Sequence, residues 1–163
     1  MNNSNELRAK LALPPINHIG VIVNHIDEAV EYYSSIFGLG PFTVYDFVPD
    51  KCWLWGEPIP LKLHMGKAMW GNIEFELIEP LGGESLHKSF LRTHGEGFHH
   101  LGFLVPNYDE MFNKFVNEGF EPLTWCDSYV ETYRGYVKAC YFDTRKVGGL
   151  IFEISTKSQL LEQ

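Results

Sequence analysis

Two histidines and two glutamates recur in this chain in matching local sequences, and together their side chains could bind a metal ion. His18 begins His-Ile-Gly-Val-Ile-Val, and His100 begins His-Leu-Gly-Phe-Leu-Val 82 residues later. Glu76 lies in Phe-Glu-Leu-Ile, and Glu153 lies in Phe-Glu-Ile-Ser 77 residues later. Each residue lies in an apolar run, where an imidazole or a charge is costly to bury without a partner. One cation would be a partner for all four.

The types of donor indicate the kind of ion and its chemistry. Two imidazoles and two carboxylates suit a borderline or hard divalent ion, namely zinc, nickel, cobalt, iron(II) or manganese. Four protein ligands on an octahedral ion leave two positions for water or for chelating substrate oxygens. We therefore predict one divalent metal ion, bound by His18, Glu76, His100 and Glu153, that acts as a Lewis acid.

Two further residues next to these four compete for the same role. Successive side chains of a strand point to opposite faces, so only one of His99 and His100 is expected to reach the site. The shared His-(Ile/Leu)-Gly pattern selects His100, which leaves His99 on the other face of the sheet. Glu74 shares the pleat parity of Glu76 but lacks the Phe-Glu-(Leu/Ile) context of Glu153. Glu74 is therefore the second choice as a ligand.

The elements that position the first histidine and glutamate are a strand, a helix and three more strands. Residues 16–23 are rich in β-branched side chains, which predicts a buried strand. Asp27 is predicted to cap a helix that Gly38 ends. The three later strands are expected at 42–47, 61–65 and 73–78. The segment between the first two of these, 48–60, is rich in tryptophan and proline and predicts a loop of the kind that lines binding sites.

The same order of elements repeats in the second half of the chain. A strand at 100–105 precedes a helix that Asp109 is expected to cap and Gly119 to end. The strands that follow are predicted at 123–125, 136–142 and 150–154. Gly119 and Pro122 follow Gly38 and Pro41 at the same offset of 81 residues.

This repetition predicts an α+β protein made of two βαβββ modules related by a pseudo-twofold axis. The first and last strands of each module should be neighbours, which brings each histidine near its glutamate. Two sheets would then face each other across a metal cleft, with the four residues at its floor. The predicted divisions are a disordered N-terminus (1–14), a first module (15–83), a linker helix (84–96), a second module (97–156) and a tail (157–163).

The composition limits the partners of the protein. Its 163 residues carry a formal net charge of −8 and a pI near 5.3, which argues against binding to nucleic acid or an anionic membrane. The cysteines Cys52, Cys126 and Cys140 are odd in number and lack CxxC spacing, so we expect neither a disulfide framework nor a cysteine zinc site. No segment resembles a signal peptide or a membrane span. We therefore predict a cytoplasmic protein that acts on a small molecule.

Five segments of the chain resemble the vicinal oxygen chelate superfamily, which includes glyoxalase I, methylmalonyl-CoA epimerase, extradiol dioxygenases and bleomycin-resistance proteins. The segments are Ile-Asn-His-Ile-Gly-Val from residue 16, Asp-Glu-Ala-Val-Glu-Tyr-Tyr from 27, Glu-Leu-Ile-Glu-Pro from 76, Gly-Phe-His-His-Leu-Gly from 97 and Ile-Phe-Glu-Ile from 151. The resemblance spans residues 16–156. It implies the glyoxalase/bleomycin resistance/dioxygenase fold, with paired βαβββ modules around a metal cleft.

Within this superfamily, the sequence around the four residues looks most like methylmalonyl-CoA epimerase. These epimerases usually carry glutamine where Glu76 stands, whereas glyoxalase I carries glutamate. The additional catalytic glutamate of the epimerases would fall near Glu57. The resemblance implies a metal-dependent isomerase, epimerase or lyase that transfers a proton next to a carbonyl. Glu153 is the first choice as the base, because the matching glutamate of glyoxalase I is both ligand and base, and Glu76 would act on the opposite face.

Two other functions are compatible with the same fold. An iron(II) extradiol dioxygenase needs two histidines and one carboxylate, which His18, His100 and Glu153 would supply. Glu76 argues against it, because a fourth ligand fills a position that oxygen or catechol would use. A non-catalytic ligand-binding or resistance protein is the other alternative, although such members generally lack the metal ligands. The expected partner is a small molecule with chelating oxygens, with a thioester and an aromatic or apolar compound as candidates, and a homodimer is the candidate assembly.

Overall fold

The computed structural model describes residues 10–130 and 134–159, so most of the predicted N-terminal segment and tail lies outside the described residues. The helices are α1 (Ile26–Phe37), α2 (Leu86–His94) and α3 (Tyr108–Asn117). The strands are β1 (His18–Ile22), β2 (Thr43–Phe47), β3 (Lys51–Leu54), β4 (Glu57–Pro58), β5 (Lys62–Trp70), β6 (Ile73–Gly82), β7 (Gly97–Leu104), β8 (Pro122–Val130), β9 (Gly135–Phe142) and β10 (Ile151–Gln159). None of these helices has the length and apolar character needed to cross a lipid bilayer.

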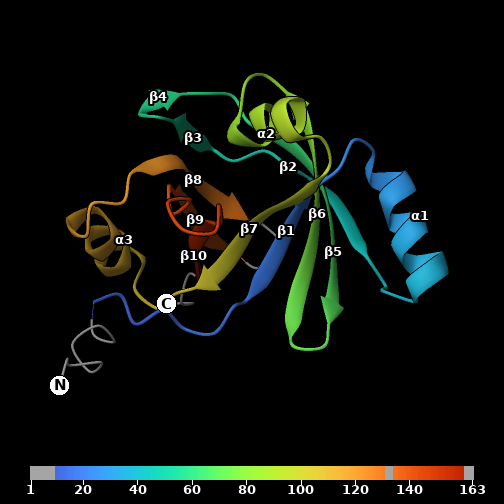
Figure 1. The fold of residues 1–163 in the computed structure, drawn as a ribbon, viewed down its shortest axis with the longest axis horizontal. Coiled ribbons are helices and arrows are strands. Elements are labelled where there is room, and N and C mark those ends of the chain that lie inside the picture. The colour runs from blue at the N-terminus through green and yellow to red at the C-terminus, as the bar shows by residue number, and fades with distance from the viewer. Residues whose placement is uncertain (1–9, 131–133, 160–163) are drawn as a thin grey trace.

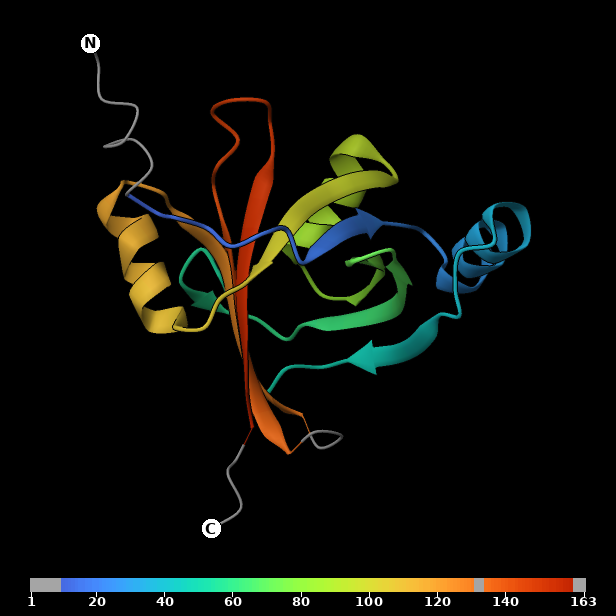
Figure 2. The same ribbon diagram turned by 90° about the horizontal axis from the view of Figure 1, so that it is seen from below.

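All the described strands belong to one strongly curved mixed sheet, in the order β2-β5-β6-β1-β7-β10-β9-β8-β3-β4 (Figures 1 and 2). β1 runs parallel to β6, and β7 runs parallel to β10, so the first and last strands of each repeat are neighbours as predicted. β1 and β7 pair antiparallel in the middle of the sheet. The prediction of two separate facing sheets is therefore wrong, because the hydrogen bonds of β1 and β7 join the two halves into one.

Apart from β3 and β4, the order of elements is βαβββ in each half of the chain. β1, α1, β2, β5 and β6 correspond to β7, α3, β8, β9 and β10. Figure 1 shows α1 and α3 at opposite ends of the molecule and α2 between them. The boundaries of the two modules as residue ranges stay a prediction.

The segment predicted as an aromatic loop contains a short hairpin, β3 and β4. Cys52 and Leu54 on β3 are buried, and β3 pairs antiparallel with β8 of the other half. Cys52 lies opposite Cys126, and the two sulfur atoms form a disulfide. Trp53 stacks on Trp125 with the ring centroids 5.9 Å apart. The prediction of no disulfide is wrong, because strand pairing between the halves brings together cysteines 74 residues apart in sequence.

Helices α1 and α3 begin differently from the sequence prediction. Neither Asp27 nor Asp109 is the N-terminal cap, and both lie in the first helical turn, where a carboxylate interacts favourably with the helix dipole. The first N–H of α1 instead donates a hydrogen bond of 2.9 Å to Glu79 on β6. The side chain of Asn107 caps α3. Gly38 ends α1 with a left-handed φ of 66°, as predicted.

One apolar cluster packs helix α2 against the sheet. Helix α2 contributes Phe90 and Leu91 to this cluster. Ile22 and Ile78 reach it from β1 and β6, on the same faces as His18 and Glu76, because alternate residues of a strand share a face. The buried residues of this cluster are Ile22, Cys52, Leu61, Leu63, Met65, Ile78 and Cys126. His18 and Glu76 therefore share their strand faces with residues of the apolar cluster.

Candidate metal centre

The four residues predicted to bind a metal come together on four adjacent strands of the sheet, β6, β1, β7 and β10. Oε2 of Glu153 lies 3.2 Å from Nε2 of His18 and 3.0 Å from Nε2 of His100. Oε2 of Glu76 lies 3.9 Å from Nε2 of His18. The exposed fractions of His18, Glu76, His100 and Glu153 are 4%, 5%, 0% and 6%. Each half of the chain contributes one histidine and one glutamate, so neither half forms the cluster alone.

Two glycines leave the space in which the imidazole rings lie. His18 pairs with Gly102 across β1 and β7, and His100 pairs with Gly20. A Cβ atom added to Gly102 would overlap the His18 ring, and one added to Gly20 would overlap the His100 ring. The two His-x-Gly segments are thus reciprocal, since the glycine of each accommodates the histidine of the other.

We expect Gly102→Ala to displace His18 and to weaken binding of a divalent ion at least tenfold, with a loss of about 1–3 kcal/mol in the free energy of unfolding. The reason is that the backbone on both sides of Gly102 is fixed by strand pairing, so the ring has to move. Gly82→Ala is the matched control, because a Cβ at this β6 glycine would meet nothing within 4 Å. Urea unfolding of metal-free protein and a zinc titration measure the two effects, and equal behaviour of both variants would contradict the steric argument.

The donor atoms fit a single divalent ion. One atom each from His18, Glu76 and His100 lies within 4.8 Å of the others, close to the spacing of ligands about 2.0–2.2 Å from a shared ion. Nδ1 of His18 lies 3.2 Å from Oδ1 of Asn17, which leaves Nε2 facing the cluster. Nε2 of His100 is buried and makes no aligned hydrogen bond within the described chain, despite its 3.0 Å distance from Glu153. The two Nε2 atoms, when unprotonated, and the carboxylates of Glu76 and Glu153 are the kinds of ligand that such an ion binds.

The charges in the cluster are strongly coupled. Burial lowers the pKa of His18, but Glu76 and Glu153 outweigh this effect and raise it to about 9. Burial raises the pKa of Glu76, but Lys67 and His18 lower it to about 2. Burial likewise opposes ionisation of Glu153, yet His18 holds its pKa well below the usual range. Without an ion, a proton on His18 therefore compensates part of the carboxylate charge.

Lys67 is a functional candidate that the sequence reasoning missed. It lies opposite Glu76 in the β5–β6 hairpin, and its ammonium forms an ion pair with Oε1 of Glu76. A second ion pair of 3.2 Å joins it to Glu74, the second-choice ligand, which is part-exposed. Counting residues back from the tight turn at Gly71 would have placed Lys67 opposite Glu76. The lysine leaves Oε2 of Glu76 facing His18 and the cluster.

The prediction that His99 faces the other side of the sheet is wrong. The register between β1 and β7 shifts after Gly20, which pairs with His100, while Val21 pairs with Phe98. His99 is the extra residue of this β-bulge, and a bulge changes the direction of the side chain. Its Nδ1 lies 3.0 Å from Nδ1 of His100.

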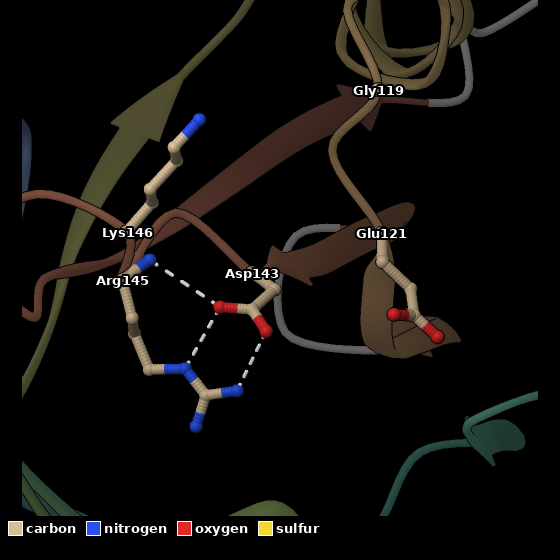
Figure 3. Close-up of a pocket in the computed structure, with 5 residues that line it drawn as sticks. All are labelled: Gly119, Glu121, Asp143, Arg145 and Lys146. Atoms are coloured by element: carbon tan, nitrogen blue, oxygen red, sulfur yellow. Dashed lines mark hydrogen bonds and ion pairs between the residues drawn. The ribbon is translucent and has the colours of Figure 1, made fainter.

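Two other locations do not contribute to the cluster. Glu57, considered from the resemblance to epimerases, is exposed on β4 at the edge of the sheet. A surface depression of about 510 Å³ is lined by Gly119, Glu121, Asp143, Arg145 and Lys146 (Figure 3). In it, Arg145 is already paired with Asp143 at 2.7 Å, and none of the four converging residues lines it.

Comparison with known proteins places these observations in a family. The model of the glyoxalase/bleomycin resistance protein/dioxygenase superfamily matches residues 17–141. An uncharacterized protein of Bacillus subtilis, YqjC, is 24% identical over 85% of this chain and 89% of its own length. The mitochondrial methylmalonyl-CoA epimerase of Bos taurus is 29% identical over 56% of this chain and 47% of its own length.

A solved structure of methylmalonyl-CoA epimerase, in complex with methylmalonyl-CoA and NH4+, has a similar fold. It superimposes with a TM-score of 0.64 and 20% sequence identity, and the match covers 90% of this chain and 96% of that one. At this level of identity the likeness shows the fold alone.

Proposed function

Because this chain belongs to the glyoxalase/bleomycin resistance protein/dioxygenase superfamily, we propose that it is a divalent-metal-dependent isomerase, epimerase or lyase that moves a proton next to a carbonyl. The observation that carries the proposal is the convergence of two buried histidines and two buried carboxylates from four adjacent strands. Buried charges of this kind are unfavourable unless a cation or proton compensates them. His18, Glu76, His100 and Glu153 are the proposed ligands.

A bound divalent ion would polarise a chelated carbonyl and acidify the neighbouring C–H bond. Glu153 is the proposed base. Its Oε2 is engaged with His18 and His100 at 3.2 and 3.0 Å, which leaves Oε1 as the oxygen to accept the proton. Glu76 comes from the other half and is assigned to the opposite face of the substrate. Its partner Lys67 keeps a pKa well above the usual range, since Glu76, Tyr45 and Glu74 outweigh its burial, so it can donate a hydrogen bond to an oxyanion.

The proposed substrate class is a small molecule with two oxygens that can chelate one ion. The methylmalonyl-CoA of the similar epimerase structure is such a thioester, and it is the first compound to test. A substrate that loses a proton next to its carbonyl becomes an enolate, and the ammonium of Lys67 would stabilise that negative charge.

Two measurements test the proposal. Elemental analysis of protein purified without added metal is expected to find about one divalent ion per chain. In deuterium oxide, the α-proton of methylmalonyl-CoA, or the corresponding proton of the glutathione hemithioacetal of methylglyoxal, is expected to exchange in the presence of the protein. Stoichiometric metal without exchange of either compound restricts the proposal to other carbonyl substrates. Absence of bound metal would favour a ligand-binding protein, and oxygen consumption with catechols under iron(II) would favour a dioxygenase.

A further inference from the structure

Behind His100, three buried polar side chains form a chain that returns to Glu153. Nδ1 of His99 lies 3.0 Å from Nδ1 of His100. The rings of His99 and His87 have centroids 5.1 Å apart, and Nε2 of His87 lies 3.3 Å from the hydroxyl of Tyr141. Tyr141 is directly opposite Glu153 in the β9–β10 pair. The sequence lets these side chains meet because α2 lies across β7 and delivers His87 between them.

Burial determines whether the side chains of His87, His99 and Tyr141 are charged. His87, His99 and Tyr141 are 1%, 2% and 9% exposed, and burial lowers the pKa of His87 to about 3. A neutral imidazole has one nitrogen that donates and one that accepts. Every link between two rings must therefore join a protonated nitrogen to an unprotonated one.

One arrangement of protons satisfies both the His100–His99 and the His87–Tyr141 hydrogen bonds. Nε2 of His100 has to be unprotonated to face an ion, so its Nδ1 donates to Nδ1 of His99. His99 then carries its proton on Nε2. That nitrogen and Nδ1 of His87 both lack a partner within the described residues, and they are a donor and an acceptor on adjacent rings. His87 carries its proton on Nε2 and donates to Tyr141.

Tyr141, the last residue of this chain, connects it to Glu153 of the cluster. Since its oxygen accepts from His87, the hydroxyl of Tyr141 is free to donate its own proton. Glu153, across the strand pair, is the acceptor that remains.

We infer that His99, His87 and Tyr141 are positioning residues, which fix the tautomer of His100 so that Nε2 faces the ion and which orient the carboxylate of Glu153. This inference rests on the proposed metal site. None of the three is a catalytic residue, because each acts through His100 or Glu153 and not on the substrate. Outer partners of metal-binding histidines typically change metal affinity by about 10- to 100-fold when they are removed.

The test uses two replacements, Tyr141→Phe, which removes only the hydroxyl, and His87→Phe, which replaces the imidazole with an aromatic ring that has no nitrogen. Each is expected to weaken zinc binding about tenfold in a competition with a chromogenic chelator. Thr124→Val is the matched control. Thr124 lies opposite Tyr141 on β8, and its buried hydroxyl has no partner within the described residues, so its loss should leave zinc affinity unchanged.

Nitrogen NMR of histidine-labelled, zinc-loaded protein provides a readout that a merely structural role would not change. The wild type is expected to carry the proton of His100 on Nδ1 and the protons of His99 and His87 on Nε2. Tyr141→Phe should convert His87 into a mixture of tautomers, because its acceptor is gone. A proton on Nε2 of His100, unchanged tautomers at His87, or wild-type zinc affinity in both phenylalanine variants would each overturn the inference.

Two outcomes separate this inference from the proposed function. A wild type that binds no zinc would contradict the proposed metal site, on which the inference rests. Zinc binding with randomly distributed tautomers would contradict the positioning chain alone.

Discussion

Replacing Glu153 with glutamine is expected to reduce exchange of the substrate α-proton by about 10²- to 10⁴-fold, the usual contribution of a general base. The amide keeps an oxygen that can face His18 and His100, so some bound metal should remain. It cannot accept the proton at neutral pH, so the exchange is lost. The measurement is the rate of deuterium incorporation by zinc-loaded protein, compared with its metal content.

Glu74→Gln is the matched control for this variant. Glu74 shares a face of β6 with Glu76 but is paired with Lys67 at 3.2 Å instead of meeting the histidines. Its replacement should change the exchange rate by no more than a few-fold. If Glu153→Gln retained wild-type exchange, Glu153 would not be the base, and Glu76→Gln would be the next variant to examine.

The apparent affinity for a divalent ion is expected to rise about tenfold per pH unit between pH 7 and pH 9 and to level off above that range. In the metal-free protein, Glu76 and Glu153 raise the pKa of His18 to about 9 against the effect of burial. Below this pH, an incoming ion must displace the proton from His18, so binding is opposed by protons. Above it, the imidazole is already neutral and no proton is released. Chelator competition across pH 6.5–9.5, with proton release followed in weakly buffered solution, measures the effect.

Two variants make this pH dependence specific to His18. Glu76→Gln removes one of the carboxylates that stabilise the imidazolium, so the pH at which affinity levels off should move downward. His64→Gln changes a histidine that is paired with Asp46 at 2.6 Å away from the cluster, and it should leave the profile unchanged. A flat profile in the wild type would contradict the protonated state of His18 in the metal-free protein.

The protonation of His18 also makes the stability of the metal-free protein depend on pH, in the direction opposite to that of metal affinity. Because the pKa of His18 is raised from 6.5 to about 9 in the folded state, its contribution is complete below pH 6.5. It is lost as the pH rises through about 9. A high pH therefore increases the affinity for the ion but lowers the stability of the metal-free protein.

The four converging residues could be predicted because the two similar halves of the chain can be aligned with each other. A strand has a side-chain period of two residues, so matching His-x-Gly and Phe-Glu segments have the same orientation in both halves. The repeated order of elements also predicted that β1 and β6, and likewise β7 and β10, are neighbours, while their parallel direction came from the structure. The side-chain period failed to predict the face of His99, because a bulge adds one residue to one strand and changes the side-chain direction without a signal in the local pattern.

What the sequence by itself determined is the repeated βαβββ order and the choice of His18, Glu76, His100 and Glu153 as the proposed metal ligands, since both depend on local periodicity and residue type. Only the tertiary structure decided which residues surround them. The disulfide of Cys52 with Cys126, the ion pair of Lys67 with Glu76 and the chain from His100 to Tyr141 all depend on strand register and on the placement of α2. These contacts join segments that are distant in sequence, and their geometry is fixed by hydrogen bonding between strands and by close packing, which no single segment encodes.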